Sequence, residues 1–202
     1  MINVPATEIF AVIAGLMLLA GAPPYLVDIL KGKTKPERAT WFIWSVLGMI
    51  ALISQINLHG HWSIVFVGLD AFGSLMVFSL SLKYGVGGWT RLDKLALVIA
   101  TAGIIFSFLA HAPIIALLGV VLADLSGAVL TVRKTFLAPE TETTITWLFV
   151  GTASLFGVLS VGKLDYGLLI YPLYLALANY SVVVAQQFGH LFHNSAAKTH
   201  IE

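Results

Sequence analysis

The sequence contains no cysteine, and only 10% of its 202 residues are charged. Without cysteine the chain has no disulfides, no thiolate zinc ligands and no thiol chemistry. A soluble domain carries about 25% charged residues, so this chain has too little polar surface to face water on all sides. The net charge of +1 says nothing about nucleic acid, but no basic patch is interleaved with aromatic residues in the manner of RNA-binding proteins. With 58% hydrophobic residues and a mean hydropathy of +0.93, the composition predicts an integral membrane protein.

Motifs of the common enzyme classes are missing from the sequence as well. We find no Ser-His-Asp set, HExxH, glycine-rich phosphate loop or paired-carboxylate hydrolase pattern. No enzymatic activity and no cofactor are therefore predicted. His190 and His193 are spaced i, i+3, but no further ligands are evident, so no metal site is predicted. The first apolar run follows no Lys or Arg and lacks a small-residue cleavage site, which favours a membrane helix over a signal peptide.

Seven apolar segments are long enough to cross a membrane as helices. About 20 mostly apolar residues span roughly 30 Å of hydrocarbon, whereas most of these segments are about twice the length of a barrel strand and lack its alternation. The predicted fold class is an all-α membrane protein with seven transmembrane helices. They cover about 8–30, 39–58, 62–84, 92–110, 112–133, 143–162 and 166–188.

Ten of the eleven lysines and arginines fall at one end of these segments, and Lys163 is the exception. The positive-inside rule places Lys/Arg-rich connections in the cytoplasm, so we expect the N-terminus outside and the C-terminus in the cytoplasm. The densest cluster is then a cytoplasmic hairpin. Setting this topology is a sufficient reason for the cluster, and binding a partner is the alternative. Its cations are Lys31, Lys33, Lys35 and Arg38.

The passage around this hairpin, PPYLVDILKGKTKPERATWFIW (23–44), has a second copy about a hundred residues later. Displacing the chain by 103 residues brings it onto TVRKTFLAPETETTITW (131–147) without a gap. An internal repeat indicates two related structural units. The matched pairs are Lys31/Lys134, Pro36/Pro139, Glu37/Glu140, Thr40/Thr143, Trp44/Trp147, Gly48/Gly151 and Leu52/Leu155.

This repeat predicts a 3+1+3 arrangement of two parallel triple-helix bundles. The fourth helix restores the direction of the second bundle, and transporters built from parallel repeats hold substrate near the midplane where the repeats meet. The predicted divisions are a first bundle at 1–90, a linker helix at 91–111, a second bundle at 112–190 and a frayed cytoplasmic tail at 191–202.

The arrangement resembles the SWEET sugar transporters and the wider PQ-loop proteins, which include cystinosin-type transporters and share their architecture with the KDEL receptor. The resemblance covers about residues 8–188 in topology. In sequence it depends on Pro23-Pro24-Tyr25 before the basic hairpin and on Trp44 in the following helix. Tyr25 stands where the family has glutamine, and the second copy has Ser126-Gly127 with no proline.

Two prolines lie about two turns from the cytoplasmic end of the first helix. A proline inside a helix removes a backbone donor and kinks the axis. In a transporter, Pro23 and Pro24 would form a hinge for the cytoplasmic gate. The structural alternative is a fixed bend.

Two aspartates lie inside predicted helices. An ionised aspartate at the membrane centre costs about 2.5–3.5 kcal/mol, so it should face the protein interior or water. Asp124 and Asp70 are therefore candidates for binding a proton, a cation or a substrate hydroxyl. The alternative is that each is hydrogen-bonded and holds helices together.

Four further residues complete the candidate substrate site. SWEET-like proteins place a substrate-binding asparagine on the third helix of each unit, and the resemblance assigns that role to Asn179. Tyr174 lies on the same helix. Trp44 and Trp147, matched by the repeat, are candidate walls of a solute pocket. Structural packing is the alternative for each.

These features favour a small-solute transporter that works by alternating access, with sugar or a similar polar metabolite as substrate. Coupling to protons through the aspartates is an open possibility. The rival hypothesis is a receptor or scaffold of KDEL-receptor-like architecture that binds a peptide or a lipid headgroup through the basic hairpin. Membrane lipids and a small polar solute are the expected partners, with protons and a second copy of the chain as further candidates. The compact loops suggest a prokaryotic plasma membrane.

Overall fold

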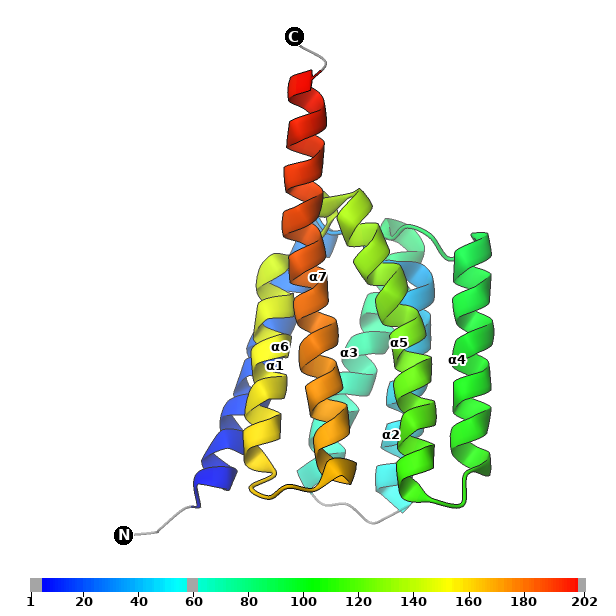
Figure 1. Ribbon diagram of the computed structural model, residues 1–202, viewed down its shortest axis with the longest axis vertical. Coiled ribbons are helices and arrows are strands. Elements are labelled where there is room, and N and C mark those ends of the chain that lie inside the picture. Colours follow the sequence, from blue (N-terminus) through cyan, green and yellow to red (C-terminus); the bar gives the residue numbers. More distant parts are fainter. Residues whose placement is uncertain (1–4, 58–61, 200–202) are drawn as a thin grey trace. The chain divides into compact units, whose positions relative to one another are not determined.

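A computed structural model describes residues 5–57 and 62–199. They form seven α-helices and a short 3-10 turn (Figure 1). The elements are α1 (Ala6–Leu30), α2 (Arg38–Asn57), α3 (Trp62–Tyr84), α4 (Arg91–Leu109), α5 (Pro113–Leu137), η1 (Pro139–Thr141), α6 (Thr144–Ser160) and α7 (Tyr166–Thr199).

The predicted all-α architecture with seven helices is confirmed, and each helix starts within two residues of its predicted position. Two helix ends were wrong. α5 continues to Leu137, and α7 continues to Thr199 instead of fraying after about residue 190. The stretch His190–Thr199 contains no proline or glycine to end a helix.

Five helices are long and apolar enough to cross a membrane: α1, α2, α4, α5 and the Tyr166–His193 part of α7. This search covers the described residues alone, and the first residues of α3 are outside it; α6, with 17 residues, lies at the lower limit for a span. Long apolar helices of this kind are those of an integral membrane protein.

The chain divides into two compact units, Met1–Lys33 with Val132–Glu202, and Thr34–Thr131. We name them the α1–α6–α7 unit and the α2–α5 unit; the last residues of α5 belong to the first. α1 thus groups with α6 and α7, whereas the predicted first bundle grouped it with α2 and α3. Compact units and sequence repeats are different divisions of a chain, so the predicted bundle boundaries stay a prediction.

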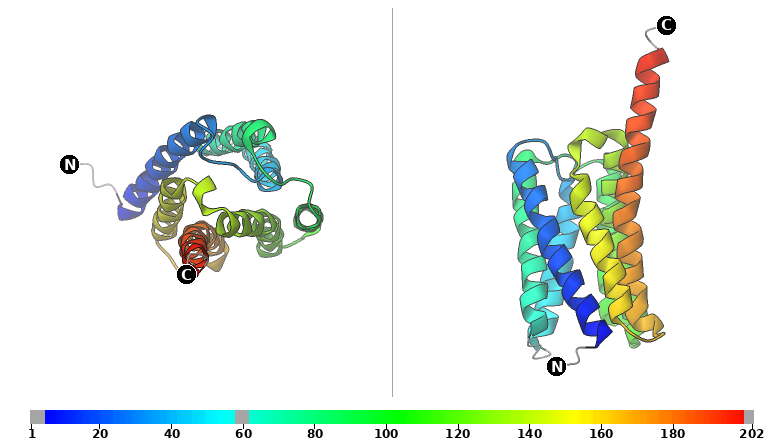
Figure 2. Two further views of the ribbon diagram at one scale, coloured as in Figure 1. Left: turned by 90° about the horizontal axis from the view of Figure 1, so that it is seen from above. Right: turned by 90° about the vertical axis from the view of Figure 1, so that its left-hand side faces the viewer.

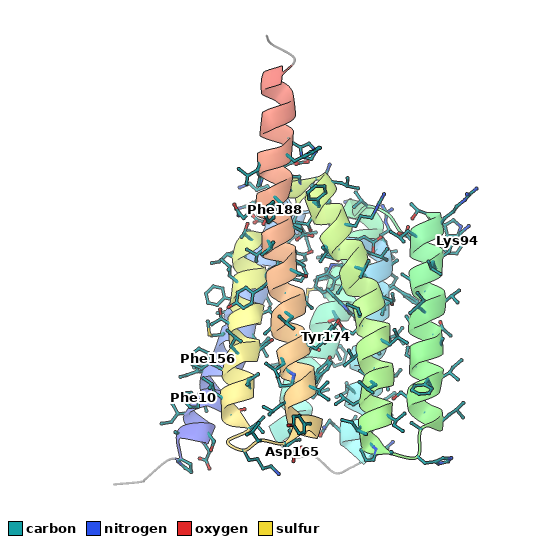
Figure 3. The ribbon with its side chains drawn as sticks, viewed as in Figure 1. Phe10, Lys94, Phe156, Asp165, Tyr174 and Phe188 are labelled. Atoms are coloured by element: carbon teal, nitrogen blue, oxygen red, sulfur yellow. The ribbon has the colours of Figure 1, made fainter. Side chains whose placement is uncertain are left out.

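Close helix contacts hold the α1–α6–α7 unit together. α1 and α6 lie side by side in both views of Figure 2, and a Cβ on Gly21 would lie 3.1 Å from Phe149 Cβ. The rings of Phe10 and Phe156 meet at 6.0 Å between the same helices (Figure 3). On the other side of α6, Gly151 lies under the Tyr180 ring of α7. Small residues allow this close approach.

The α2–α5 unit is packed in the same manner. Gly48 of α2 meets Ala71 of α3, and Gly103 of α4 meets Gly119 of α5, where a Cβ on either glycine would lie 2.6 Å from the other's carbonyl oxygen. Between α2, α4 and α5 lies a core of small and aliphatic side chains. Its buried members are Ala39, Ile43, Ala96, Ala100, Ala123 and Leu130.

Candidate functional site

A fully enclosed carboxylate lies at the end of the α1–α6–α7 unit where α6 begins. The side chain of Glu142 is 0% exposed, and Lys134 Nζ donates to its Oε1 at 2.6 Å. Trp147 Nε1 donates to Oε2 at 2.8 Å, and the Tyr25 hydroxyl donates to Oε1 at 3.4 Å. Lys134 Nζ also donates to the Thr141 carbonyl at 3.0 Å. A buried ion pair needs such additional hydrogen bonds to offset its desolvation; we name these residues the Glu142 cluster.

The Glu142 cluster is part of a set of bonds that fastens α1 to α6. Thr146 Oγ1 donates to the Gly21 carbonyl at 2.8 Å, and Thr143 Oγ1 donates to Asp28 Oδ2 at 3.0 Å. With Tyr25, these contacts lie on both sides of Pro23 and Pro24, through which the helix continues. The prolines leave the carbonyls four residues earlier without their helical donors. The weak point of α1 is thus braced by its neighbour.

α7 holds the chain just before α6 through one side chain. Gln186 is 3% exposed, and its Nε2 donates to the carbonyls of Pro139 at 2.8 Å and Glu142 at 3.0 Å. Thr144 Oγ1 donates to Gln186 Oε1 at 2.6 Å. The amide therefore fixes η1 and the first residue of α6 against α7.

The α2–α5 unit carries the first copy of the repeated passage, where the buried acid is Glu37. It is 4% exposed, and its Oε2 accepts from the Thr40 backbone N–H at 2.7 Å, which caps α2. Burial raises the pKa of Glu37, and the charge of Asp93 raises it further, against the opposing effect of the hydrogen bonds from Thr40. Its Oε1 has no hydrogen-bond partner among the described residues.

Backbone and side-chain bonds surround this cap. Arg38 donates to the carbonyls of Ser81, Gly85 and Gly87 at 2.9, 2.6 and 2.9 Å. Backbone bonds join the same chain segments: Val86 N–H donates to the Pro36 carbonyl at 2.9 Å, and Arg38 N–H donates to the Val86 carbonyl at 3.0 Å. The connection after α3 is thereby fixed to the start of α2.

A threonine of the same passage joins α2 to α5. Thr40 is fully buried, and its Oγ1 donates to the Gly127 carbonyl at 2.7 Å. Thr131 Oγ1 donates in turn to Thr40 Oγ1 at 3.1 Å.

The two predicted tryptophans lie close to these contacts. Trp147 is 4% exposed and meets the Tyr25 ring edge-on at 5.8 Å within the Glu142 cluster. Trp44 is half-buried, meets Trp41 edge-on at 5.1 Å and lies against Gly127. A role for either as a pocket wall stays a prediction.

The predicted polar ligands have different surroundings. Asp124 is buried in α5, whereas Asp70 is exposed on α3 and makes no ion pair within the described part of the chain. Asn179 is buried, and its Nδ2 donates to the Leu175 carbonyl of its own helix at 2.7 Å. Tyr174, labelled in Figure 3, is half-buried with its ring 6.2 Å from that of Tyr171. Asp70 and Asp124 belong to the α2–α5 unit, and Asn179 and Tyr174 belong to the α1–α6–α7 unit, so each pair is described within its own unit.

Sequence reasoning missed Glu142 and Gln186. The displacement by 103 residues matches Glu37 with Glu140, which is exposed, while the buried acid of the second passage is Glu142. The signal available was a lysine at the end of one apolar segment and a glutamate at the start of the next. Gln186 gave a signal too, as a polar residue inside a predicted span.

Comparisons with protein-family models, with curated proteins and with solved structures find no match to this chain. Function has to be inferred from the residues themselves.

Proposed function

We propose that this protein is a small-solute membrane transporter that works by alternating access, with a sugar or a similar polar metabolite as substrate. The observation that carries the proposal is the braced double proline of α1. A transporter needs one helix that can bend at a defined point and contacts that hold it in one state. Pro23 and Pro24 supply the bend, and Tyr25, Gly21 and Asp28 are the points at which α6 holds it.

The pairing of helices supports the predicted repeat. Under the displacement of 103 residues, α1 corresponds to α5, α2 to α6 and α3 to α7. α6 binds α1 through Thr146 and Gly21, and α2 binds α5 through Thr40 and Gly127. Each compact unit therefore combines the first helix of one predicted bundle with the second and third helices of the other, and α4 is the extra helix of the α2–α5 unit.

Within this proposal Asp124 is the leading polar ligand. A carboxylate in a spanning helix is costly and marks a functional pathway by default, and Asp124 is 7% exposed in the helix that corresponds to α1. Asp70, Asn179 and Tyr174 would add polar ligands, and Trp44 and Trp147 the walls. The proposed topology has seven spans with the N-terminus outside and the C-terminus in the cytoplasm of a prokaryote. Protons and a second copy of the chain are further proposed partners. The pH dependence of uptake tests the first, and light scattering tests the second.

The alternative is a receptor or scaffold of KDEL-receptor-like architecture. One observation favours it: Lys31, Lys33 and Lys35 are exposed and take no part in the clusters above. Cations next to an anionic leaflet contribute about 1 kcal/mol each to surface attraction.

The proposal is tested with purified protein in liposomes and a panel of labelled sugars, amino acids and vitamins. We expect uptake of at least one solute above protein-free liposomes, and we expect Asp124→Asn to change its rate or its pH dependence at least several-fold. Asp165→Asn, an acid of the exposed α6–α7 connection, is the matched control and should leave uptake unchanged. Two results together would favour the receptor: the folded protein takes up none of the solutes, and it binds anionic vesicles in a way that Lys31→Gln with Lys33→Gln abolishes.

A further inference from the structure

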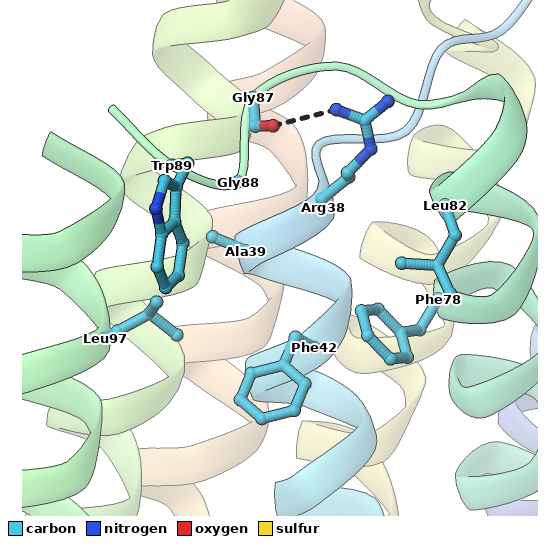
Figure 4. A pocket seen from close by; sticks show the side chains of 9 residues that line it. All are labelled: Arg38, Ala39, Phe42, Phe78, Leu82, Gly87, Gly88, Trp89 and Leu97. Atoms are coloured by element: carbon cyan, nitrogen blue, oxygen red, sulfur yellow. Dashed lines mark hydrogen bonds between the residues drawn. The ribbon is translucent and has the colours of Figure 1, made fainter. Parts of the chain in front are cut away.

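An apolar groove opens between α2, α3 and α4 at the end of the α2–α5 unit where Arg38 begins α2. Its volume is about 390 Å³. Figure 4 shows the rings of Phe42 and Phe78 on one side and Trp89 above Leu97 on the other. Leu82 completes the apolar lining, and Arg38 lies at the rim.

The connection between α3 and α4 is built to keep this groove open. Gly87 and Gly88 have φ angles of 69° and 97°, which favour glycine. A Cβ on Gly87 would overlap Glu37 Oε1, and one on Gly88 would lie 3.0 Å from Arg38 Cβ. The connection therefore lies tightly against the first turn of α2 and turns Trp89 outward, where it is 76% exposed.

One cation, Arg38, lines the groove, and further cations lie on the helix that follows Trp89. Lys94 Nζ lies 5.3 Å from the centre of the Trp89 ring, and Arg91 is exposed at the start of α4. The guanidinium of Arg38 has five N–H groups, of which three serve the carbonyls of the α3–α4 connection. Two acids lie nearby, Glu37 and Asp93, and both are buried as helix caps.

The distance along α4 from its cations to the apolar lining matches a lipid's headgroup and the top of its acyl chain. Leu97 follows Arg91 by six residues, which is about 9 Å along a helix. Tryptophan and lysine at such a level are typical of the membrane interface. A lipid phosphate at the cations would leave its chain beside Phe42, Phe78 and Leu97.

We propose that this groove is a binding site for an anionic phospholipid. Arg38, Arg91 and Lys94 bind the headgroup, and one acyl chain occupies the apolar lining beneath Trp89. These three cations select an anionic lipid over a zwitterionic one of the same chain length. The site requires membrane insertion of the α2–α5 unit but does not depend on solute transport.

The test uses the full chain in nanodiscs that contain either phosphatidylglycerol or phosphatidylcholine with the same brominated acyl chains. Bromine quenches tryptophan fluorescence at contact, and the difference between the wild type and Trp89→Phe isolates the Trp89 signal. We expect phosphatidylglycerol at the same mole fraction to quench Trp89 several-fold more strongly than phosphatidylcholine. Arg91→Gln with Lys94→Gln should bring that ratio close to one, while both residues lie outside the folded core.

The matched control is Lys31→Gln with Lys33→Gln, which removes two exposed cations of the α1–α6–α7 unit. It should keep the wild-type ratio. Equal quenching by the two lipids would overturn the proposal, as would an equal loss of preference in both double variants, which would mean general surface attraction. A different outcome is that neither lipid quenches Trp89 and light scattering shows two chains in each nanodisc. That result would assign the groove to a second copy of the chain instead.

Discussion

The two copies of the repeated passage make the same hydrogen bond with different kinds of donor. In both, the carbonyl of the repeated proline is bound by a donor from the third helix of its predicted bundle or from the chain that follows it. At Pro36 the donor is the backbone N–H of Val86, and at Pro139 it is the side-chain Nε2 of Gln186.

The difference follows from where each third helix ends. α3 stops at Tyr84, so the next backbone N–H groups are free to pair with the segment before α2. α7 runs on to Thr199, and its backbone N–H groups are used within the helix. A side chain has to supply the donor there, and Gln186 has the two that are needed. A repeat can thus conserve a contact while the donor moves from backbone to side chain.

The aligned charged residues of the two passages also differ, in whether they are buried or exposed. Lys31 and Glu140 are exposed, whereas Lys134 and Glu37, their partners in the alignment, are buried. Lys134 is neutralised by Glu142, and Glu37 caps a helix.

Removing one partner of the Lys134–Glu142 pair should have the largest effect. Glu142→Leu leaves the ammonium of Lys134 buried without its counter-charge, which costs about 3–5 kcal/mol. The thermal midpoint in a fixed detergent should fall by about 10 °C. The double variant with Lys134→Met should recover most of the loss, because an apolar pair can replace a buried ion pair.

The aligned residues provide the control for this cycle. Lys31→Met and Glu140→Leu change the same residue types at exposed positions and should move the midpoint little. If Glu140→Leu lowers the thermal midpoint as much as Glu142→Leu does, burial is not the reason that an acid of this passage matters for stability.

Gln186→Leu should have the next largest effect. It leaves the carbonyls of Pro139 and Glu142 without their donor inside the protein, which costs about 2 kcal/mol. Gln187→Leu makes the same change one residue later on the exposed side of α7 and should be close to neutral in the same thermal assay. Equal midpoints for the two variants would contradict the view that a side chain replaces the backbone donor here.

The helices were predictable from sequence because their signals are local. Apolar runs of about 20 residues indicated the seven segments. The end of α7 was not marked in this way, because a polar helix beyond a span has the same composition as a frayed tail.

The partners of each residue could not be predicted. Glu140 is exposed and Glu142 is buried, although they lie only two residues apart, and the alignment matched Glu37 with Glu140. The contact of α1 with α6 joins residues more than a hundred positions apart, as in the bond from Thr146 to Gly21. Predicted site residues were therefore found at defined places, but their common role stays a prediction.

The inter-helix threonines should contribute less than the side chains above. Thr40→Val removes two hydrogen bonds from a buried position and should cost about 1–2 kcal/mol, while Thr146→Val removes one and should cost about 1 kcal/mol. Thr101→Val is the control, since Thr101 is exposed and its hydroxyl donates to the Leu97 carbonyl of its own helix. Urea or detergent unfolding of the three variants should rank them in this order, and a larger loss in Thr101→Val would contradict it.

The protonation of Glu37 should make stability depend on pH. Its pKa is raised in the folded protein from 4.5 by burial, so between pH 4.5 and the higher folded pKa the folded state binds more protons than the unfolded state. The free energy of unfolding should then fall as pH rises through that window, with a slope no steeper than about 1.4 kcal/mol per pH unit for one proton. Glu37→Gln keeps an acceptor for the Thr40 N–H and removes the titration, so the variant should gain stability relative to the wild type as pH rises. Glu140→Gln, at the exposed acid aligned with Glu37, should show no such gain. If the difference in unfolding free energy between Glu37→Gln and the wild type stays constant with pH, folding does not change the pKa of the Glu37 carboxyl.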